Sequence, residues 1–452
     1  MHVGTNTIAG VIGDFVARAQ PPDAARRRAA DAFCDTIGVI LAGAVEPAAE
    51  IARSVLESSG PCRVLARREQ VGPAEAALAN GVAAHALDYD DMCFVSLAHP
   101  SSALVPAALA AGELAGASGR AALDAYIVGF ELECRLGLVM NPRHYHRRGW
   151  HCTSSIGTVG AAAAAARALG LAPPAAAHAV GIAASAACGL KENIGTMVKP
   201  LHAGMAARNG VMAARLAQAG FTASERAIDG PQGYLAAMDS ERPAAALAGA
   251  LADLGARWEI LDTGITVKLY PSCAATHPPL DALLELVRRH RFAGDDVEAI
   301  DVEVDSMTPR LLIYDRPATG LEGKFSMPFC AAAAVVFGQP VVDTFEPDRI
   351  EDPRVQRVMP RVTLRTAPEF DAAQPLSQAR VTVRLRDGRT LIGRADGARG
   401  YPGRLTDEEL ATKFLACAAR SLDREAAERL LDLARSMPDL ADVRSLTAAC
   451  AP

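Results

Sequence analysis

Aromatic side chains are scarce in this sequence, at 5% of 452 residues, whereas hydrophobic residues of all kinds make up 50%. Alanine supplies much of that hydrophobic half, and such small side chains indicate tightly packed helices. A basic excess is also lacking, because 46 basic residues stand against 52 acidic ones and the formal charge is −6. This balance does not indicate the basic surface that binds nucleic acid.

No run of strongly apolar residues is long enough for a membrane span, which needs about 20 of them. The longest weakly polar stretch, residues 157–190, is mainly alanine and glycine and is interrupted by Arg167, Pro173 and His178. The first residues, Met1–Asn6, do not lead from a basic segment into an apolar one, so a secretory signal is not expected. We therefore expect a soluble, cytoplasmic protein with neither a membrane nor a nucleic acid as partner.

Several familiar catalytic motifs are missing. The 10 cysteines are scattered from Cys34 to Cys450 without a CxxC pair, which indicates reduced, mostly buried thiols. No glycine-rich loop follows an expected strand, GxSxG does not occur, and no cysteine stands in a nucleophile motif. The sequence thus lacks the signals for nucleotide binding, hydride transfer and acyl transfer.

Helical patterns fill the chain from Ile8 to about Leu261. The segments with the most evident patterns are 23–41, 102–115, 157–169 and 200–219. The last of these is expected to open with Pro200 in its first turn, where the missing N–H costs least. Small residues such as Gly204 and Gly210 recur along it, which predicts close packing against a neighbouring helix, with a functional role left open for Gly204 alone.

The periodicity changes after about Thr266. Apolar and polar residues then alternate, as in half-buried strands, over 299–304, 361–364 and 381–385. Asp387-Gly388 predicts a hairpin turn between the last of these strands and another at 390–392. Helices are expected between the strands, at 279–290 and 327–337.

Helix returns at Thr406, which forms a capping box with Glu409. In the simplest architecture these C-terminal helices rejoin the first domain. The predicted fold is mainly α, with a large all-helical domain of residues 1–266 that is completed by 405–452. A smaller α+β domain, residues 267–404, is inserted into it.

Three carboxylates, Asp88, Asp90 and Asp91, stand within four positions before a break in the helical pattern. Because like charges this close raise one another's pKa, one of them could stay protonated or sit in a cationic pocket. The alternative is a solvated helix end or loop cap, where Asp is common.

His99 precedes Pro100, which disfavours helix at His99 and is expected to hold it extended at a loop end. Ser101 or Ser102 is then expected to cap the next helix. The imidazole would face the first turn of that helix and any anion bound there. An ordinary surface histidine is the alternative.

His151 follows His144 and His146, and three histidines so close together suggest a zinc site. No HExxH helix is present, however, and the two-residue spacing suits a strand better than this helical region. We therefore expect no metal here.

Lys199 stands directly before Pro200, where its ammonium would add to the positive end of the helix dipole and hold a carboxylate. His202 follows one helical turn later, on the same face. An exposed lysine is the alternative. Lys268 and His277 lie where the helical part gives way to the α+β part, and residues at such a junction can reach a ligand cleft.

Histidine, lysine and aspartate near two expected helix N-termini suit abstraction of a proton next to a carboxylate. In their order along the chain, these motifs resemble the MmgE/PrpD family, which includes 2-methylcitrate dehydratases, cis-aconitate decarboxylases and iminodisuccinate epimerases. The blocks that carry the resemblance are the Asp88 cluster with His99-Pro100-Ser101, Gly149-x-His151-x-Thr153, Lys199-Pro200-Leu201-His202-x-Gly204, Lys268-x-Tyr270-Pro271 and Lys324-Phe325-Ser326.

The resemblance covers nearly the whole chain. It implies a large helical domain, a smaller α+β lid, an active site between them and a homodimer, with no metal and no organic cofactor. The catalytic positions that it implies are Asp88, His99, His151, Lys199 and His277. The substrate-binding positions that go with them are His202, Lys268 and Ser101.

The function that the resemblance implies is that of a lyase or isomerase acting on a small di- or tricarboxylate. Dehydration of a 2-methylcitrate-like hydroxy acid ranks first, and epimerisation of an iminodisuccinate-like dicarboxylate second. Decarboxylation ranks third, because Met92 stands where members related to cis-aconitate decarboxylase commonly carry threonine. A helical binding protein with a degenerate site is the non-enzyme alternative, but this chain keeps ionisable residues at all five catalytic positions.

Overall fold

The computed structural model describes residues 7–57, 59–373 and 376–452. The first six residues, which bear on the expectation about a secretory signal, lie outside the described residues. The chain divides into two compact units. Unit 1 comprises Met1–Ala86, Asp90–Thr266 and Thr406–Pro452, and unit 2 comprises Leu87–Tyr89 and Val267–Leu405.

Unit 1 is built almost wholly of helices. In chain order they are α1 (Ile8–Arg18), α2 (Asp23–Gly43), α3 (Pro47–Ser54), α4 (Pro73–His85), α5 (Pro100–Ala115), α6 (Gly119–Met140), α7 (Arg143–His146), α8 (Cys152–Ala168), α9 (Pro173–Ala186), α10 (Val198–Gln218), α11 (Tyr234–Ala237), α12 (Ala246–Ala250), α13 (Glu259–Asp262), α20 (Asp407–Ala418), α21 (Arg424–Arg435) and α22 (Arg444–Ala449). A two-stranded antiparallel ribbon of β1 (Cys62–Arg63) and β2 (Gln70–Val71) accompanies them. The alternation patterns did not predict this ribbon, because each strand is only two residues long.

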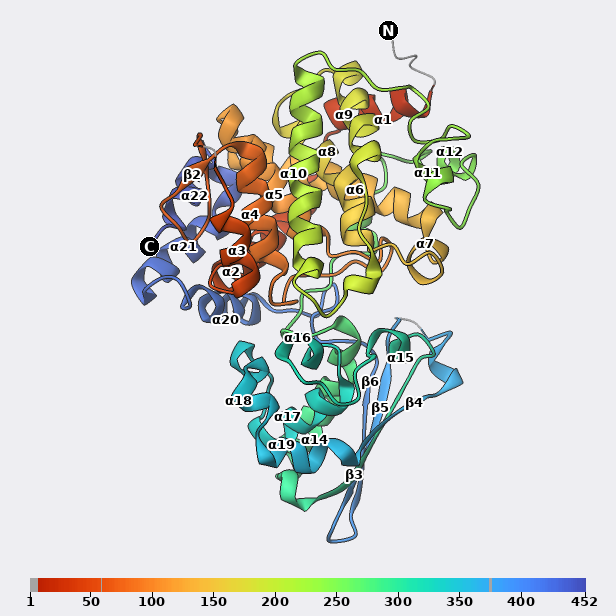
Figure 1. Cartoon of the computed structure of the whole chain (residues 1–452), viewed down its shortest axis with the longest axis vertical. Helices are drawn as coiled ribbons and strands as arrows, with labels where there is room; N and C mark the ends of the chain where they lie inside the picture. The colour runs from red at the N-terminus through yellow and green to blue at the C-terminus, as the bar shows by residue number, and fades with distance from the viewer. Residues whose placement is uncertain (1–6, 58, 374–375) are drawn as a thin grey trace. The chain divides into compact units, whose positions relative to one another are not determined.

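Helix α10 packs closely against α4 and α8 (Figure 1). A Cβ atom at Gly204 would lie 2.5 Å from the carbonyl oxygen of Leu78 on α4, and one at Gly210 would lie 2.5 Å from Cβ of Ala161 on α8. Only glycine permits these approaches, so the predicted close packing along this segment is confirmed. The contacts fix α10 against the middle of α4 and against α8.

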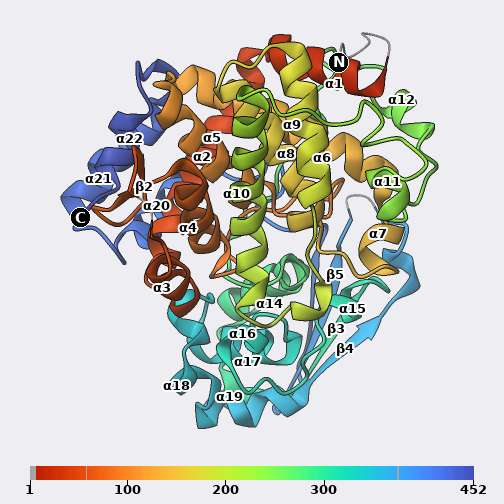
Figure 2. The ribbon, with the colours of Figure 1, turned by 45° about the horizontal axis from the view of Figure 1, so that its top comes forward.

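Unit 2 combines a four-stranded sheet with short helices. Its elements are α14 (His277–His290), β3 (Val297–Val304), α15 (Thr308–Leu311), α16 (Gly320–Gly323), α17 (Met327–Phe337), α18 (Pro347–Ile350), α19 (Pro353–Val358), β4 (Val362–Thr366), β5 (Ala379–Leu385) and β6 (Thr390–Ala395). The strand order is β4-β3-β5-β6, with β3 parallel to β4 and antiparallel to β5. Helices α14 and α17 pack against this sheet (Figure 2).

The alternating pattern of β3 separates the two faces of the sheet. Ile300 and Val302 are buried with the residues of α17 in one hydrophobic core, whereas Asp301 forms an ion pair with Arg384 of β5 on the opposite face. Pairing of Ile300 with Val383 keeps apolar side chains in register across β3 and β5. The predicted strands and the mainly helical character of the chain are thereby confirmed.

The first residues of α5 and α10 differ from those predicted, whereas the start of α20 agrees with the prediction. The N-cap of α5 is His99, and Ser102 donates its hydroxyl proton to the carbonyl of His99 instead of capping the helix. Helix α10 begins at Val198, so Lys199 lies inside its first turn and not before it. Thr406 and Glu409 form the predicted capping box of α20.

Among the helices within the described ranges, none alone combines the length and the apolarity of a membrane span. Helices α2 and α3, which are bent by 83° at the break between them, reach that threshold only as a pair, by length and composition.

Candidate functional site

Four helix ends meet in unit 1 and bring ionisable side chains together. His85 is the last residue of α4, while His99 and His151 are the N-caps of α5 and α8. Lys199 and His202 lie in the first two turns of α10. Because the free N–H groups at three helix N-termini carry partial positive charge, the arrangement suits an anion.

The imidazoles of this site form one cluster. The ring centre of His85 lies 4.6 Å from that of His99 and 5.8 Å from that of His151. The ring of His202 lies 5.1 Å from that of His151. His99 is the most accessible of the four, with 15% of its side chain exposed, and the others are buried.

His85 connects an acidic and a basic side chain. Its Nδ1 atom lies 2.7 Å from Oδ2 of Asp90, and its Nε2 atom lies 2.8 Å from Nζ of Lys199. The side chains of His85 and Asp90 are fully buried. A carboxylate, an imidazole and an ammonium group are thus joined by two hydrogen bonds inside unit 1.

His151 and His202 are held as neutral imidazoles. Burial lowers the pKa of His151 far below its ordinary value, and the charge of Lys199 adds to this effect. Burial also lowers the pKa of His202 to about 4. A neutral imidazole is the form that can accept a proton from a substrate.

His99 is oriented by its own loop and by helix α8. Its Nδ1 atom lies 2.9 Å from the carbonyl oxygen of Asp91, and its backbone N–H donates to Oγ1 of Thr153 over 3.1 Å. His99 is outside the helical region, as predicted, but its backbone (φ −105°, ψ 80°) is not in the extended region that was expected.

Asp91 lies in a separate buried network. Burial raises its pKa to about 8, so this carboxyl is protonated at neutral pH. The cause is mainly burial, and the neighbouring carboxylates that suggested a shift add less. Ser101 forms a hydrogen bond with Asp91, and its Oγ atom lies 2.7 Å from the hydroxyl of Tyr126. Through these hydrogen bonds, Ser101 stabilises the loop before α5.

The other predicted residues lie in unit 2. Lys268 donates from Nζ to the backbone carbonyl and to Oδ1 of Asp88, both over 2.9 Å, and its side chain is fully buried. His277 is also buried, with its Nε2 atom 3.4 Å from the carbonyl oxygen of Ser272 and its ring 4.9 Å from that of Tyr270. Unit 2 thus brings Asp88 and Lys268 together.

Several residues of these sites had no role in the sequence-based assignment. His85 and Tyr126 were missed, Asp90 was noted only as part of the acidic cluster, and Lys324 only as part of a motif. Lys324 donates from Nζ to the carbonyl oxygens of Leu87 and Pro271, over 2.8 and 2.9 Å. The one available signal for His85 is its position directly ahead of the acidic cluster, at the end of an alanine-rich helix.

Three histidines offer a possible set of metal ligands. One nitrogen atom of each of His85, His99 and His151 lies within 4.8 Å of the others. The metal-ligand set that the sequence suggested around His144 does not form among the described residues. The Nε2 atom of His144 lies 2.7 Å from Oγ of Ser155, and its Nδ1 atom faces the carbonyl oxygen of Met238. The histidine pattern that first suggested zinc is therefore not the group that converges.

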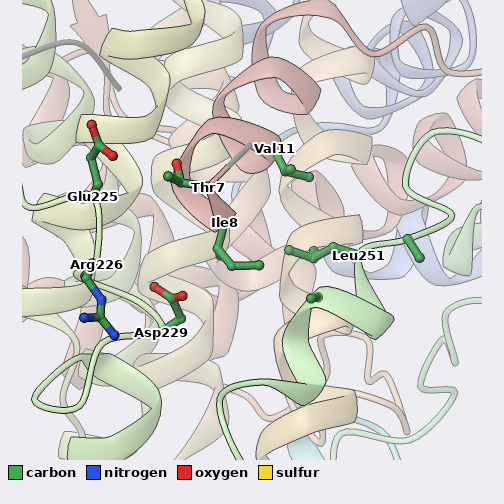
Figure 3. A pocket seen from close by; sticks show the side chains of 9 residues that line it. Thr7, Ile8, Val11, Glu225, Arg226, Asp229 and Leu251 are labelled. Atoms are coloured by element: carbon green, nitrogen blue, oxygen red, sulfur yellow. The ribbon is translucent and has the colours of Figure 1, made fainter. Parts of the chain in front are cut away.

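A pocket of about 590 Å³ lies in unit 1, away from these histidines (Figure 3). None of its lining residues belongs to the predicted site. It combines apolar and charged side chains, among them Ile8, Val11, Leu251, Glu225, Arg226 and Asp229.

Comparisons with known proteins agree with the order of the motifs. Residues 8–246 match the MmgE/PrpD N-terminal domain and residues 270–439 match the MmgE/PrpD C-terminal domain. The cis-aconitate decarboxylase-like protein oryM of Aspergillus oryzae is 31% identical over 93% of this chain and 92% of its own length. The cis-aconitate decarboxylases of Aspergillus terreus and Mus musculus are 28% and 30% identical, over 86% and 83% of this chain and 84% and 78% of their own lengths. With both domains matched in order and relatives aligned over most of its length, the chain belongs to the MmgE/PrpD family.

Proposed function

We propose that this chain is a cofactor-free lyase that acts on a small polycarboxylate, with cis-aconitate as the first candidate substrate. The observation that carries the proposal is the neutral imidazole of His151 beside the charge of Lys199, at converging helix N-termini. The helix ends and Lys199 would hold substrate carboxylates. His151 would move a proton at the neighbouring carbon.

Decarboxylation and dehydration make similar demands on this site. In decarboxylation, the bond between carbon and carboxylate breaks, CO₂ leaves, and the electron pair stays on the substrate, where a carbon takes up one proton that an acid must supply. In dehydration, a base removes the carbon-bound proton, and an acid gives a proton to the hydroxyl group, which then leaves as water. Both reactions need a cation beside the developing negative charge and one group that exchanges protons.

The relatives favour decarboxylation over the dehydration that was ranked first, because those named above are two cis-aconitate decarboxylases and a protein like them. Met92 remains the departure that keeps dehydration of a hydroxy tricarboxylate and epimerisation of an iminodicarboxylate as alternatives. Met92 exchanges two backbone hydrogen bonds of 2.9 Å with Thr266, so its backbone is fixed within unit 1.

A panel of polycarboxylates in heavy water, followed by proton NMR, separates these reactions. Release of CO₂ with one deuterium gained would identify a decarboxylase, and loss of water a dehydratase. Deuterium exchange without net conversion would identify an epimerase. If the protein binds a member of the panel in calorimetry but neither converts any of them nor exchanges deuterium into any of them, it is a binding protein and the proposed activity is wrong.

A further inference from the structure

The three side chains of Asp90, His85 and Lys199 form a hydrogen-bonded series, the Asp90–His85–Lys199 triad. Its two contacts define one arrangement of protons. A lysine ammonium can only donate hydrogen bonds, and a carboxylate can only accept them. The imidazole between them must therefore donate toward Asp90 and accept from Lys199. A neutral His85 that carries its proton on Nδ1 satisfies both contacts, which measure 2.7 and 2.8 Å.

The opposite tautomer conflicts with both neighbours. A proton on Nε2 would point at the N–H groups of Lys199, and the lone pair on Nδ1 would face the carboxylate of Asp90. Inside a fully buried site such conflicts are costly, because water cannot replace the lost partners. Asp90 thus selects the tautomer of His85, and that tautomer makes His85 an acceptor for Lys199.

We propose that Asp90 and His85 are positioning residues that hold Lys199 as an oriented ammonium group, so that it can bind a carboxylate of the substrate. The carboxylate ligand rests on the proposed function, whereas the tautomer of His85 does not. The tight packing of α10 against α4 supplies the frame: Gly204 of α10 lies against Leu78 of α4, and Lys199 in the first turn of α10 contacts His85, the last residue of α4.

Other charged and titratable groups also face the Asp90–His85–Lys199 triad. Nδ1 of His99 lies 3.6 Å from Oδ2 of Asp90, and the rings of His99 and His151 lie beside that of His85. His202 is coupled electrostatically to both His85 and Lys199. The test must therefore assign the signals of these four histidines separately.

The first test reads the tautomer directly and needs no turnover. In protein labelled with ¹⁵N-histidine, His85 is expected to show a protonated Nδ1 and an unprotonated Nε2, with its signals assigned by their loss in His85→Phe or, if that variant does not fold, in His85→Gln. A proton on Nε2 would overturn the proposal. So would an imidazolium signal, because Lys199 would then be the neutral partner.

The second test asks whether His85 acts through Lys199. Propane-1,2,3-tricarboxylate, a saturated tricarboxylate, is titrated into the variants by calorimetry. Lys199→Met is expected to weaken binding about 30- to 5,000-fold and His85→Phe about 10- to 150-fold. In the double variant, His85→Phe should add almost nothing to the effect of Lys199→Met. His178→Phe, which replaces a buried histidine of α9 outside the cluster, is the matched control and should bind normally.

The outcomes separate the two proposals. Normal binding by His85→Phe, or effects that add fully in the double variant, would overturn the positioning role while leaving the lyase possible. If tricarboxylates bind and respond as expected but none is converted, the positioning role holds and the proposed activity fails. If no tricarboxylate binds to the unaltered protein, the role of Lys199 as a carboxylate ligand fails, whatever the tautomer of His85.

Discussion

The Nδ1 atoms of His151 and His202 lie 3.0 Å apart. Since burial keeps both imidazoles neutral, one of them donates to the other. If His151 is the donor, its Nε2 atom carries a lone pair and can accept a proton from a substrate. His202, which the sequence placed among substrate-binding residues, then fixes the tautomer of the base.

His151→Gln is expected to lower kcat about 10²- to 10⁴-fold, because a positioned proton-transfer group is lost. The measurement is turnover of the substrate identified by the panel, together with incorporation of solvent deuterium at the substrate carbon. A variant that incorporated deuterium at the rate of the unaltered protein would remove His151 from this role. His99, the other histidine at a helix N-terminus, would be the next candidate.

His202→Phe is expected to lower kcat by about 2- to 10-fold, the effect of one orienting hydrogen bond. His202→Gln should restore part of that loss, because its amide oxygen can accept the proton on Nδ1 of His151. An equal loss in both variants, confined to KM, would instead support the original assignment of His202 to substrate binding.

The elements were predictable from local patterns, whereas the chemistry of the site depends on long-range contacts. Alternation identified β3 and β5, and the Thr406 capping box identified the start of α20. His85 was missed because a single histidine at the end of an alanine-rich helix carries no periodic signal. Its contact with Lys199 joins residues 114 positions apart.

The acidic cluster shows the same limit. The spacing of Asp88, Asp90 and Asp91 indicated perturbed carboxyl groups, but nothing local assigned each one a partner. In the structure, Asp88 pairs with Lys268, Asp90 with His85, and Asp91 with Ser101. Burial, which sequence proximity does not measure, is the largest cause of the raised pKa of Asp91.

Asp91→Asn is expected to change how stability depends on pH. Because the pKa of Asp91 is raised to about 8 in the folded protein, the folded state keeps a proton that the unfolded chain releases near pH 4. Its stabilising effect is complete below about pH 4 and is lost as pH rises through about 8. The unfolding free energy of the original protein, relative to the variant, should therefore fall by about 1.4 kcal/mol per pH unit in this range.

Urea unfolding between pH 5 and pH 8 measures this difference, and histidine effects cancel because both proteins contain the same histidines. Asparagine keeps the shape of the side chain but cannot ionise. If the difference between the two proteins stayed constant across this range, Asp91 would be ionised throughout and its raised pKa would be wrong.

Lys268→Met is expected to destabilise the protein by about 3–5 kcal/mol, because it leaves the buried carboxylate of Asp88 without its ammonium partner. Arg384→Gln is the matched control, since it removes an ion pair with Asp301 whose arginine side chain is 47% exposed, and it should cost at most about 1 kcal/mol. The loss of stability in each variant is measured from the midpoint of its urea unfolding curve. Equal, small losses would mean that the Asp88–Lys268 pair does not carry a buried charge.

Activity is expected to survive removal of metal ions. Although His85, His99 and His151 approach one another closely enough for a metal site, both nitrogen atoms of His85 face other partners, Asp90 and Lys199. A metal ion would have to displace one of these partners and would sit beside the lysine charge, which opposes a second cation. Turnover after dialysis against EDTA should therefore equal that before it. Loss of turnover on dialysis, with recovery on adding zinc, would instead make the three histidines a catalytic metal centre.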